Sequence, residues 1–305
     1  MSAIKIGVIG GTGLGQLLGD SEGERHEVQT PFGPPSGAIV ETEWEGLSVL
    51  LLQRHGAGHM FHPSRVPYRA NIYALKQLGC THLIASAACG SLRQEFKPRD
   101  LVVVDQLIDR TSHREGTFFD AAAVHVEFAE PFCGGLRKLL LESGKETASE
   151  GGFAVHDGGC YVCMEGPAFS TRAESLMHRL MGGDLIGMTA CPEAKLAREA
   201  EIPYALVALV TDYDSWKGKP VGKEGEVATP EALLQEIIAN MQAASANAMG
   251  VVRRALGKIA ADAGVLGASP ASEALKLAIW SYKAAIPKEE IQRLWALWGK
   301  YFPVE

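Results

Sequence analysis

The chain has 305 residues, of which 47% are hydrophobic and 21% charged, and its formal net charge is −7 at pH 7. These values are typical of a globular protein with one large or two small domains, and the negative charge argues against a general nucleic-acid-binding surface. No apolar run approaches the roughly 20 residues of a membrane span, and the first residues lack the pattern of a signal peptide. We therefore expect a cytoplasmic protein that binds neither nucleic acid nor membrane.

The N-terminal half predicts strands that end in small or polar residues. Residues 4–9 read as the first strand and run into Gly10-Gly11-Thr12-Gly13-Leu14-Gly15. The backbone N–H groups of such a turn can hold phosphate, although a plain tight turn has the same composition. The spacing fits neither GxGxxG, because position 16 is Gln16, nor the P-loop, because no Gly-Lys-Ser/Thr follows.

The strand predicted over residues 47–53 ends at Arg54 and His55. Arginine at a strand end can bind phosphate with two hydrogen bonds and His55 would add a donor, but the pair also fits a surface turn. His59 and His62 follow closely, with no carboxylate or cysteine at ligand spacing, so we expect no metal here. The other elements predicted in this half are a helix over residues 67–78 and strands over residues 81–88 and 101–108.

A long polar connection over residues 109–130 has the character of segments found at functional sites or interfaces. The elements expected after it are strands over residues 160–164, 184–188 and 204–210, and helices over residues 131–141, 171–181 and 192–201. Residues 217–228 are rich in Gly, Lys and Glu, which predicts a flexible lid or linker.

Three helices are predicted in the C-terminal part. A long Ala-rich helix begins at Thr229-Pro230-Glu231, which supplies an N-cap and a first-turn proline, and runs to about Ala261. Ser269-Pro270 begins another. The last, over residues 287–302, is amphipathic. Its apolar stripe carries Ile291, Leu294, Trp295, Trp298 and Phe302.

Six cysteines lie mostly in apolar segments, as expected for reduced, buried thiols. Cys160 and Cys163 have CxxC spacing, but in extended backbone they point to opposite faces and no second pair completes a zinc site. We therefore expect neither a metal nor a redox role for this pair.

Two carboxyl groups follow the strand over residues 204–210, in Thr211-Asp212-Tyr213-Asp214-Ser215-Trp216. Open α/β sheets bind ligands outside the carboxyl ends of their strands, and residues two apart point the same way in extended backbone. This predicts two acids on one pocket wall, the alternative being a capped turn with Asp214 in solvent. Carboxylates repel phosphate, so the acids and the glycine-rich turn would contact opposite ends of the bound ligands. A purine nucleoside together with phosphate fits this arrangement.

Taken in order over roughly residues 4–250, these motifs resemble the trimeric purine nucleoside phosphorylase family, and within it the S-methyl-5'-thioadenosine phosphorylases. The segments that carry the resemblance are residues 10–14, 30–36, 54–56, 88–92, 105–111, 129–133, 165–170, 188–189 and 211–216. The resemblance implies the α/β nucleoside phosphorylase fold, a single three-layer domain with a central mixed β-sheet flanked by helices, over residues 1–265. Residues 266–305 would be a C-terminal helical extension, packed on the domain or on a neighbouring subunit and reaching beyond the family's usual end.

The resemblance also implies roles for individual residues. Asp212 and Asp214 would be catalytic and bind N7 and the 6-amino group of the purine. Phosphate would be held by Thr12, Arg54, His55, Ala87, Ala88 (through its backbone N–H) and Thr189. The nucleoside would be contacted by Phe169, Ser170, Met188, His59 and, from a neighbouring subunit, His125. Ala87 stands where the family usually has a hydroxyl residue, and Gly187 replaces a larger polar residue.

The activity implied is phosphorolysis of S-methyl-5'-thioadenosine to adenine and 5-methylthioribose 1-phosphate, in purine and methionine salvage. The enzyme would be a homotrimer with active sites at subunit interfaces, with phosphate as co-substrate and neither cofactor nor metal. The alternative on the same fold is a 6-oxopurine nucleoside phosphorylase acting on 5'-methylthioinosine, inosine or guanosine. The failed GxGxxG argues against a dinucleotide-dependent dehydrogenase. A non-enzymatic nucleoside-binding module would not depend on phosphate.

Overall fold

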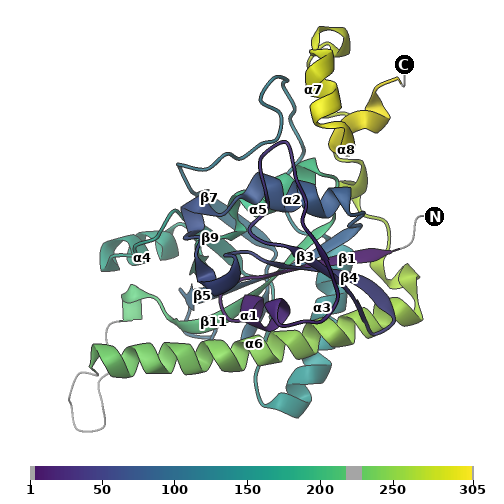
Figure 1. The fold of residues 1–305 in the computed structure, drawn as a ribbon. Coiled ribbons are helices and arrows are strands. Elements are labelled where there is room, and N and C mark those ends of the chain that lie inside the picture. The colour runs from purple at the N-terminus through teal and green to yellow at the C-terminus, as the bar shows by residue number, and fades with distance from the viewer. Residues whose placement is uncertain (1–3, 218–228, 304–305) are drawn as a thin grey trace.

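The computed structural model describes residues 4–217 and 229–303, so nearly all of the lid or linker predicted over residues 217–228 lies outside the described residues. A mixed β-sheet forms the middle layer and helices cover both of its faces (Figure 1). Two large clusters of buried apolar side chains lie on opposite faces of the sheet. The predicted three-layer α/β architecture with a central mixed sheet is therefore confirmed.

The sheet branches at its central strand. The path runs β2-β3-β4-β1-β5-β10-β9-β7, while β11 pairs with β5 and β6, and β6 pairs with β8. The strands are β1 (Lys5–Gly10), β2 (Glu24–His26), β3 (Ile39–Trp44), β4 (Leu47–Gln53), β5 (His82–Ser91), β6 (Leu101–Val103), β7 (Gln106–Arg110), β8 (Val155–Asp157), β9 (Cys160–Met164), β10 (Leu185–Gly187) and β11 (Tyr204–Tyr213).

β5 changes neighbours along one edge, and this opens the sheet. Its residues 82–85 pair with β1 and its residues 90–91 pair with β10, while β11 follows it on the other edge. The backbone groups of residues 86–89 that face β1 and β10 therefore have no strand partner. Buried backbone groups require hydrogen-bond partners, so this gap is a natural place for a polar ligand.

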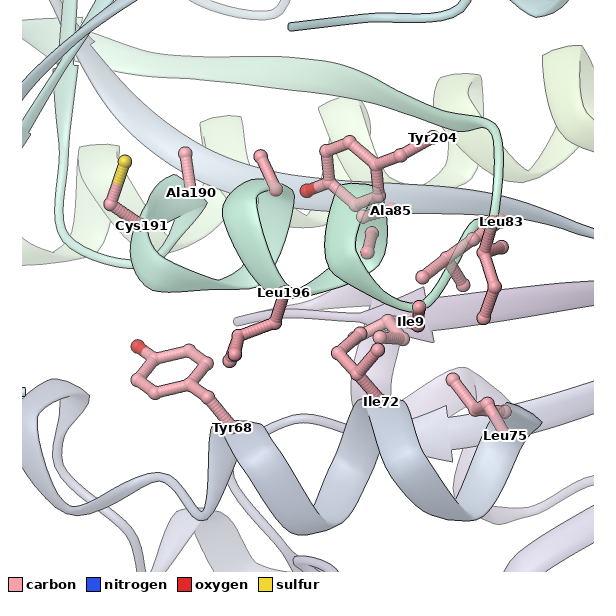
Figure 2. Close-up of a cluster of buried hydrophobic side chains, with 14 of the residues drawn as sticks. Ile9, Tyr68, Ile72, Leu75, Leu83, Ala85, Ala190, Cys191, Leu196 and Tyr204 are labelled. Atoms are coloured by element: carbon pink, nitrogen blue, oxygen red, sulfur yellow. The ribbon is translucent and has the colours of Figure 1, made fainter. Parts of the chain in front are cut away.

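The helices fall into two groups by the face that they cover. The helices are α1 (Leu14–Gly19), α2 (Tyr68–Gln77), α3 (Gly134–Gly151), α4 (Arg172–Leu180), α5 (Ala190–Glu199), α6 (Pro230–Ala261), α7 (Lys288–Arg293) and α8 (Trp295–Trp298). Side chains of α2 and α5 meet those of β1 and β5 in the first cluster, which Figure 2 shows around Ile9, Ile72 and Leu196. α1, α3 and α6 cover the opposite face. No helix among the described residues is both long and apolar enough to cross a membrane.

Several predicted boundaries are confirmed and others are wrong. The strands over residues 47–53 and 160–164 and the long helix ending at Ala261 have the predicted bounds. The strand predicted over residues 101–108 is two strands, because β6 pairs in one branch of the sheet and β7 in the other. The helix predicted from residue 131 begins at Gly134 and extends to Gly151, and Ser269-Pro270 begins only a short 3-10 turn over Pro270–Glu273.

The C-terminal segment packs partly on the body of its own chain. The prediction of a single amphipathic helix over residues 287–302 is wrong, because the structure has two short helices and a 3-10 turn there. Leu294, with φ −109° and ψ 21°, separates α7 from α8. Trp298 is fully buried and lies against Phe119, with ring centroids 4.7 Å apart. Packing of single side chains into the core, rather than one continuous apolar stripe, determines the course of this segment. The domain boundary at residue 265 stays a prediction.

Glu199 of α5 attaches the long polar connection over residues 109–130 to the rest of the domain. One of its carboxyl oxygens accepts a hydrogen bond of 2.8 Å from the backbone N–H of Phe118, and burial raises the pKa of Glu199 to about 7. The folded state therefore keeps a proton that the unfolded state releases near pH 4.5, so the free energy of unfolding falls as pH rises from about 4.5 to about 7.

We expect Glu199→Gln to remove this pH dependence. The stability of the wild-type protein relative to the variant should fall between pH 4.5 and 7 by on the order of 3 kcal/mol, because 1 pKa unit corresponds to 1.36 kcal/mol. Urea unfolding of both proteins at several pH values measures the difference. A constant difference across this window would contradict the raised pKa.

Candidate active site

One pocket, of about 330 Å³, lies at the carboxyl ends of β1, β4, β5 and β11, next to β10. It contains the gap beside β5. The predicted site residues that line it are Thr12, His55, His59, Ala87, Ala88, Phe169, Ser170, Met188, Thr189, Asp212 and Asp214. Two predicted residues, Arg54 and His125, do not line it.

The two acids form one end of the pocket. Asp212 lies within β11, directly after an irregularity in the pairing between Val210 and Asp212, and Asp214 follows the strand end. Oγ1 of Thr211 is 2.6 Å from Oδ1 of Asp212. Burial raises the pKa of Asp212, the Thr211 hydroxyl opposes this rise, and the nearby Asp214 adds to it. Protonated Asp212 is thus present at higher pH than for an exposed aspartate.

Asp214 presents an unused acceptor at the same end. The side chain is buried, and among the described residues its Oδ2 has no hydrogen-bond partner. Its backbone N–H donates to the carbonyl of Ser91, 3.0 Å away, which fixes the residue against β5. An unpaired buried carboxyl oxygen is costly, so a ligand that donates a hydrogen bond to it is strongly favoured.

The glycine-rich turn closes the other end of the pocket. A Cβ atom on Gly11 would lie 2.5 Å from Nη1 of Arg54 and 2.8 Å from the carbonyl oxygen of Ser86, so only glycine fits there. Gly13 has φ 87°, which favours glycine. The turn therefore brings Thr12 into the pocket beside the gap at residues 86–89. The pocket thus joins an end suited to an anion with an end that carries two acids.

Arg54, predicted to bind phosphate directly, lies behind the pocket wall. Its guanidinium is fully buried and forms two hydrogen bonds with Glu193, of 2.7 Å and 2.8 Å, and one with the carbonyl of Ser86, of 2.7 Å. Glu193 also accepts from the hydroxyl of Tyr204. Glu193 belongs to α5, 139 positions away, which is why local sequence did not indicate the pair.

His55 lines the pocket. The sequence predicts that it donates a hydrogen bond to phosphate, whereas its geometry favours an acceptor role. Its Nδ1 is 2.7 Å from the carbonyl oxygen of Phe61. Burial and the charge of Arg54 lower the pKa of His55 to about 4, so the ring is neutral at pH 7. With Nδ1 donating to that carbonyl, Nε2 is an acceptor. His59 stacks on the same ring, with centroids 4.1 Å apart.

His125 belongs to a different surface. Its backbone N–H donates to Ala278, and its ring lies 4.7 Å from that of Trp280, which is 71% exposed. Leu277 and Tyr282 close by in the sequence are also largely exposed. Large exposed apolar side chains grouped in this way are typical of interaction surfaces.

Further residues of the pocket wall were not predicted from the sequence. They include Pro63, Met164, Ile186, Ile237 and Met241. Ile237 and Met241 come from α6, whose apolar residues are so frequent that no local signal marks those facing a pocket. Among the described residues, no group of three or more His, Cys, Asp and Glu side chains is placed to hold a metal ion.

Comparison with known proteins gives consistent results. The family model for the phosphorylase superfamily matches residues 5–257. The S-methyl-5'-thioadenosine phosphorylase of Gloeobacter violaceus is 44% identical over 97% of this chain and 96% of its own length. That of Chloroflexus aurantiacus is 44% identical over 99% of this chain and its whole length, so the C-terminal segment does not extend beyond this relative.

Solved structures show the same likeness. A methylthioadenosine phosphorylase sourced from an antarctic soil metagenomic library has a TM-score of 0.85 and 41% identity, covering 97% of this chain and 99% of its own. A mutant adenosine/methylthioadenosine phosphorylase from Schistosoma mansoni, in complex with methylthioadenosine, has a TM-score of 0.75 and 36% identity, covering 85% of this chain and 93% of its own.

Proposed function

Because the chain belongs to the phosphorylase superfamily and is therefore an enzyme, we propose that it catalyses the phosphorolysis of S-methyl-5'-thioadenosine. The products are adenine and 5-methylthioribose 1-phosphate, which makes the protein a pentosyltransferase. The observation that carries this proposal is the acid end of the pocket, where a carboxyl group with a raised pKa lies beside a carboxyl oxygen without a partner.

The acid pair matches the edge of adenine. N7 of the purine is an acceptor, so it pairs with the proton of Asp212, and the 6-amino group is a donor, so it pairs with Oδ2 of Asp214. As the glycosidic bond breaks, negative charge builds on the purine and Asp212 donates its proton to N7. A 6-oxopurine would instead place an oxygen against the acceptor of Asp214 and leave it unpaired.

Phosphate takes the other end, in the gap beside β5. Thr12, Thr189 and the backbone N–H of Ala88 supply donors, while neutral His55 accepts from the hydroxyl of a protonated phosphate. Arg54 supports this end from behind the glycine-rich turn, where two of its five N–H groups are not used by the bonds described above. The phosphate is thereby positioned to attack the anomeric carbon from the ribose face opposite the purine, and positioning supplies much of the rate.

Other parts of the pocket fit the rest of the nucleoside. Met188 contacts the ribose, and Phe169 and Ser170 contact the base. Ile237 and Met241, with His59, offer an apolar wall for a methylthio group. We further propose a homotrimer in which the surface around His125 covers a neighbour's pocket, since Phe169 at the pocket is 85% exposed in the single chain.

The first experiment follows free adenine from S-methyl-5'-thioadenosine with and without phosphate. We expect release that depends on phosphate, together with much slower turnover of 5'-methylthioinosine and inosine. Release of adenine without phosphate would identify a hydrolase instead. Faster turnover of the 6-oxo compounds would contradict the role of Asp214 and leave the fold unchanged.

Asp214→Asn tests the 6-amino contact directly. The amide offers a donor that suits a 6-oxo group, so we expect kcat/KM to fall about 10- to 100-fold for S-methyl-5'-thioadenosine and to rise for 5'-methylthioinosine. The ratio of the two kcat/KM values is the measurement. The matched control is Asp184→Asn, which removes a carboxylate that pairs with Arg93 outside the pocket lining. An equal loss on both substrates would show that Asp214 does not read the purine.

A further inference from the structure

A buried hydroxyl group without a partner lies beside the phosphate end of the pocket. Tyr161 of β9 is fully buried, and among the described residues its hydroxyl oxygen makes no hydrogen bond. Most buried hydroxyl groups are hydrogen-bonded, so an exception next to a binding site calls for an explanation. The residue is not part of the pocket lining, so any effect on the substrate passes through its neighbours.

One of these neighbours is Gly187, which does line the pocket. A Cβ atom built on Gly187 would lie 1.8 Å from the Tyr161 hydroxyl oxygen and 2.6 Å from Cζ. The hydroxyl thus occupies the space that a side chain at position 187 would fill. β10 and β9 are parallel, with Leu185 opposite Tyr161, so the ring reaches along the strand to the end of β10.

The contact with Gly187 lies at the start of a three-residue segment of the pocket wall. Burial raises the pKa of Tyr161 well above its usual range. The hydroxyl lies against Gly187, the first residue of the short segment Gly187-Met188-Thr189. This segment connects β10 to α5 and carries Met188 and Thr189 into the pocket.

Ala87, on β5, belongs to the same face of the sheet as Tyr161. Residues two apart in a strand share a face, and Ala87, Cys89 and Tyr161 all belong to the same core cluster. β10 runs antiparallel to the end of β5, next to these residues. Of the two positions in the pocket wall where the family resemblance implied larger side chains, 87 and 187, it is position 187 whose side-chain space the Tyr161 hydroxyl occupies.

We propose that Tyr161 is a positioning residue for phosphate. Its hydroxyl fills the space that a side chain at position 187 would take, and it thereby fixes the segment that carries Met188 and Thr189. This inference rests on the proposed function. It differs from general packing in one respect, because the hydroxyl group and not the ring should determine how well Thr189 meets the phosphate. The ring remains in Tyr161→Phe, so that variant isolates the hydroxyl.

The test is steady-state kinetics of Tyr161→Phe with phosphate and S-methyl-5'-thioadenosine varied separately. We expect KM for phosphate to rise about five- to tenfold, because the wall segment that carries Thr189 loses the contact that fixes Gly187, with kcat and KM for the nucleoside changed less than about threefold. The control is Tyr73→Phe, whose hydroxyl donates to the carbonyl of Arg293 outside the pocket lining and should leave KM for phosphate unchanged.

Gly187→Ala probes the same contact from the other side. The added methyl group collides with the Tyr161 hydroxyl, so we expect KM for phosphate to rise. If both residues act through one contact, the double variant should be less impaired than the product of the two single effects. If the effects of the two single variants multiply in the double variant, the proposal is overturned. An unchanged KM for phosphate in Tyr161→Phe would also overturn it, as would a variant in which kcat falls and both KM values rise to the same extent.

Titration with inorganic phosphate alone separates this inference from the proposed function. If the wild-type protein binds phosphate by calorimetry but releases no adenine, the proposed function fails. Weaker phosphate binding by Tyr161→Phe than by the wild-type protein would then still support the role of Tyr161. Equal phosphate binding by the two proteins would overturn it, and absence of phosphate binding by the wild-type protein would overturn both.

Discussion

Asp212→Ala should lower kcat/KM for S-methyl-5'-thioadenosine by about 10²- to 10⁴-fold, the range typical of a lost general acid. The purine leaves with negative charge on its ring, and the variant offers no proton to N7. Because alanine carries no transferable proton at any pH, the variant should also not regain activity at low pH. Initial rates of adenine release from pH 5 to 9 measure both effects.

Asp212→Asn is the matched variant, since its amide can donate a hydrogen bond to N7 but cannot transfer a proton. We expect a smaller loss than for alanine. In the wild-type protein kcat should fall as pH rises through the pKa of Asp212, because only the protonated carboxyl donates. That alkaline fall should be absent in Asp212→Asn. An unchanged profile in the variant would assign the titration to another group.

Glu193→Gln should destabilise the fold by about 3–5 kcal/mol, because it leaves the charge of Arg54 buried without its counter-charge. Glu193 is 1% exposed and Arg54 is fully buried, so water cannot replace the lost interaction. The free energy of unfolding from guanidinium titration, followed by tryptophan fluorescence at fixed protein concentration, is the measurement.

Two controls separate the charge from the packing. The double variant Arg54→Met with Glu193→Leu removes both charges and should recover much of the stability, since apolar pairs often replace buried ion pairs at little cost. Arg254→Met breaks an ion pair with Glu150 that lies at the surface and should cost less than about 1 kcal/mol. A cost for Glu193→Gln as small as that of Arg254→Met would show that the buried pair contributes little.

The polar residues at strand ends were readable from the sequence because strand periodicity and strand ends are local properties. Asp212 and Asp214 follow an apolar run, and Thr12 lies in a glycine-rich turn after another. Their convergence follows from one rule, that ligands of such sheets bind at the carboxyl ends of the strands. The structure brings them together in one pocket.

The direction of individual side chains was not readable in the same way. Arg54 follows a strand as expected, but its ion pair with Glu193 joins residues far apart in the chain and turns the guanidinium behind the wall. His55 has one nitrogen bound to the carbonyl of Phe61, and this decides which nitrogen remains for a ligand. The first contact joins residues 139 positions apart, and the second depends on how the loop after His55 folds back, so a local pattern contains neither.

The sequence by itself determined the layered α/β architecture, the family and half of the residues that line the pocket, because all of these depend on local periodicity and on motifs in a particular order. Only the tertiary structure decided the gap beside β5, the unpaired oxygen of Asp214 and the contact between Tyr161 and Gly187. The physical reason is that strand pairing and the burial of a polar atom are set by neighbours distant in sequence. The chemistry of the site depends on which atoms those neighbours leave without a partner.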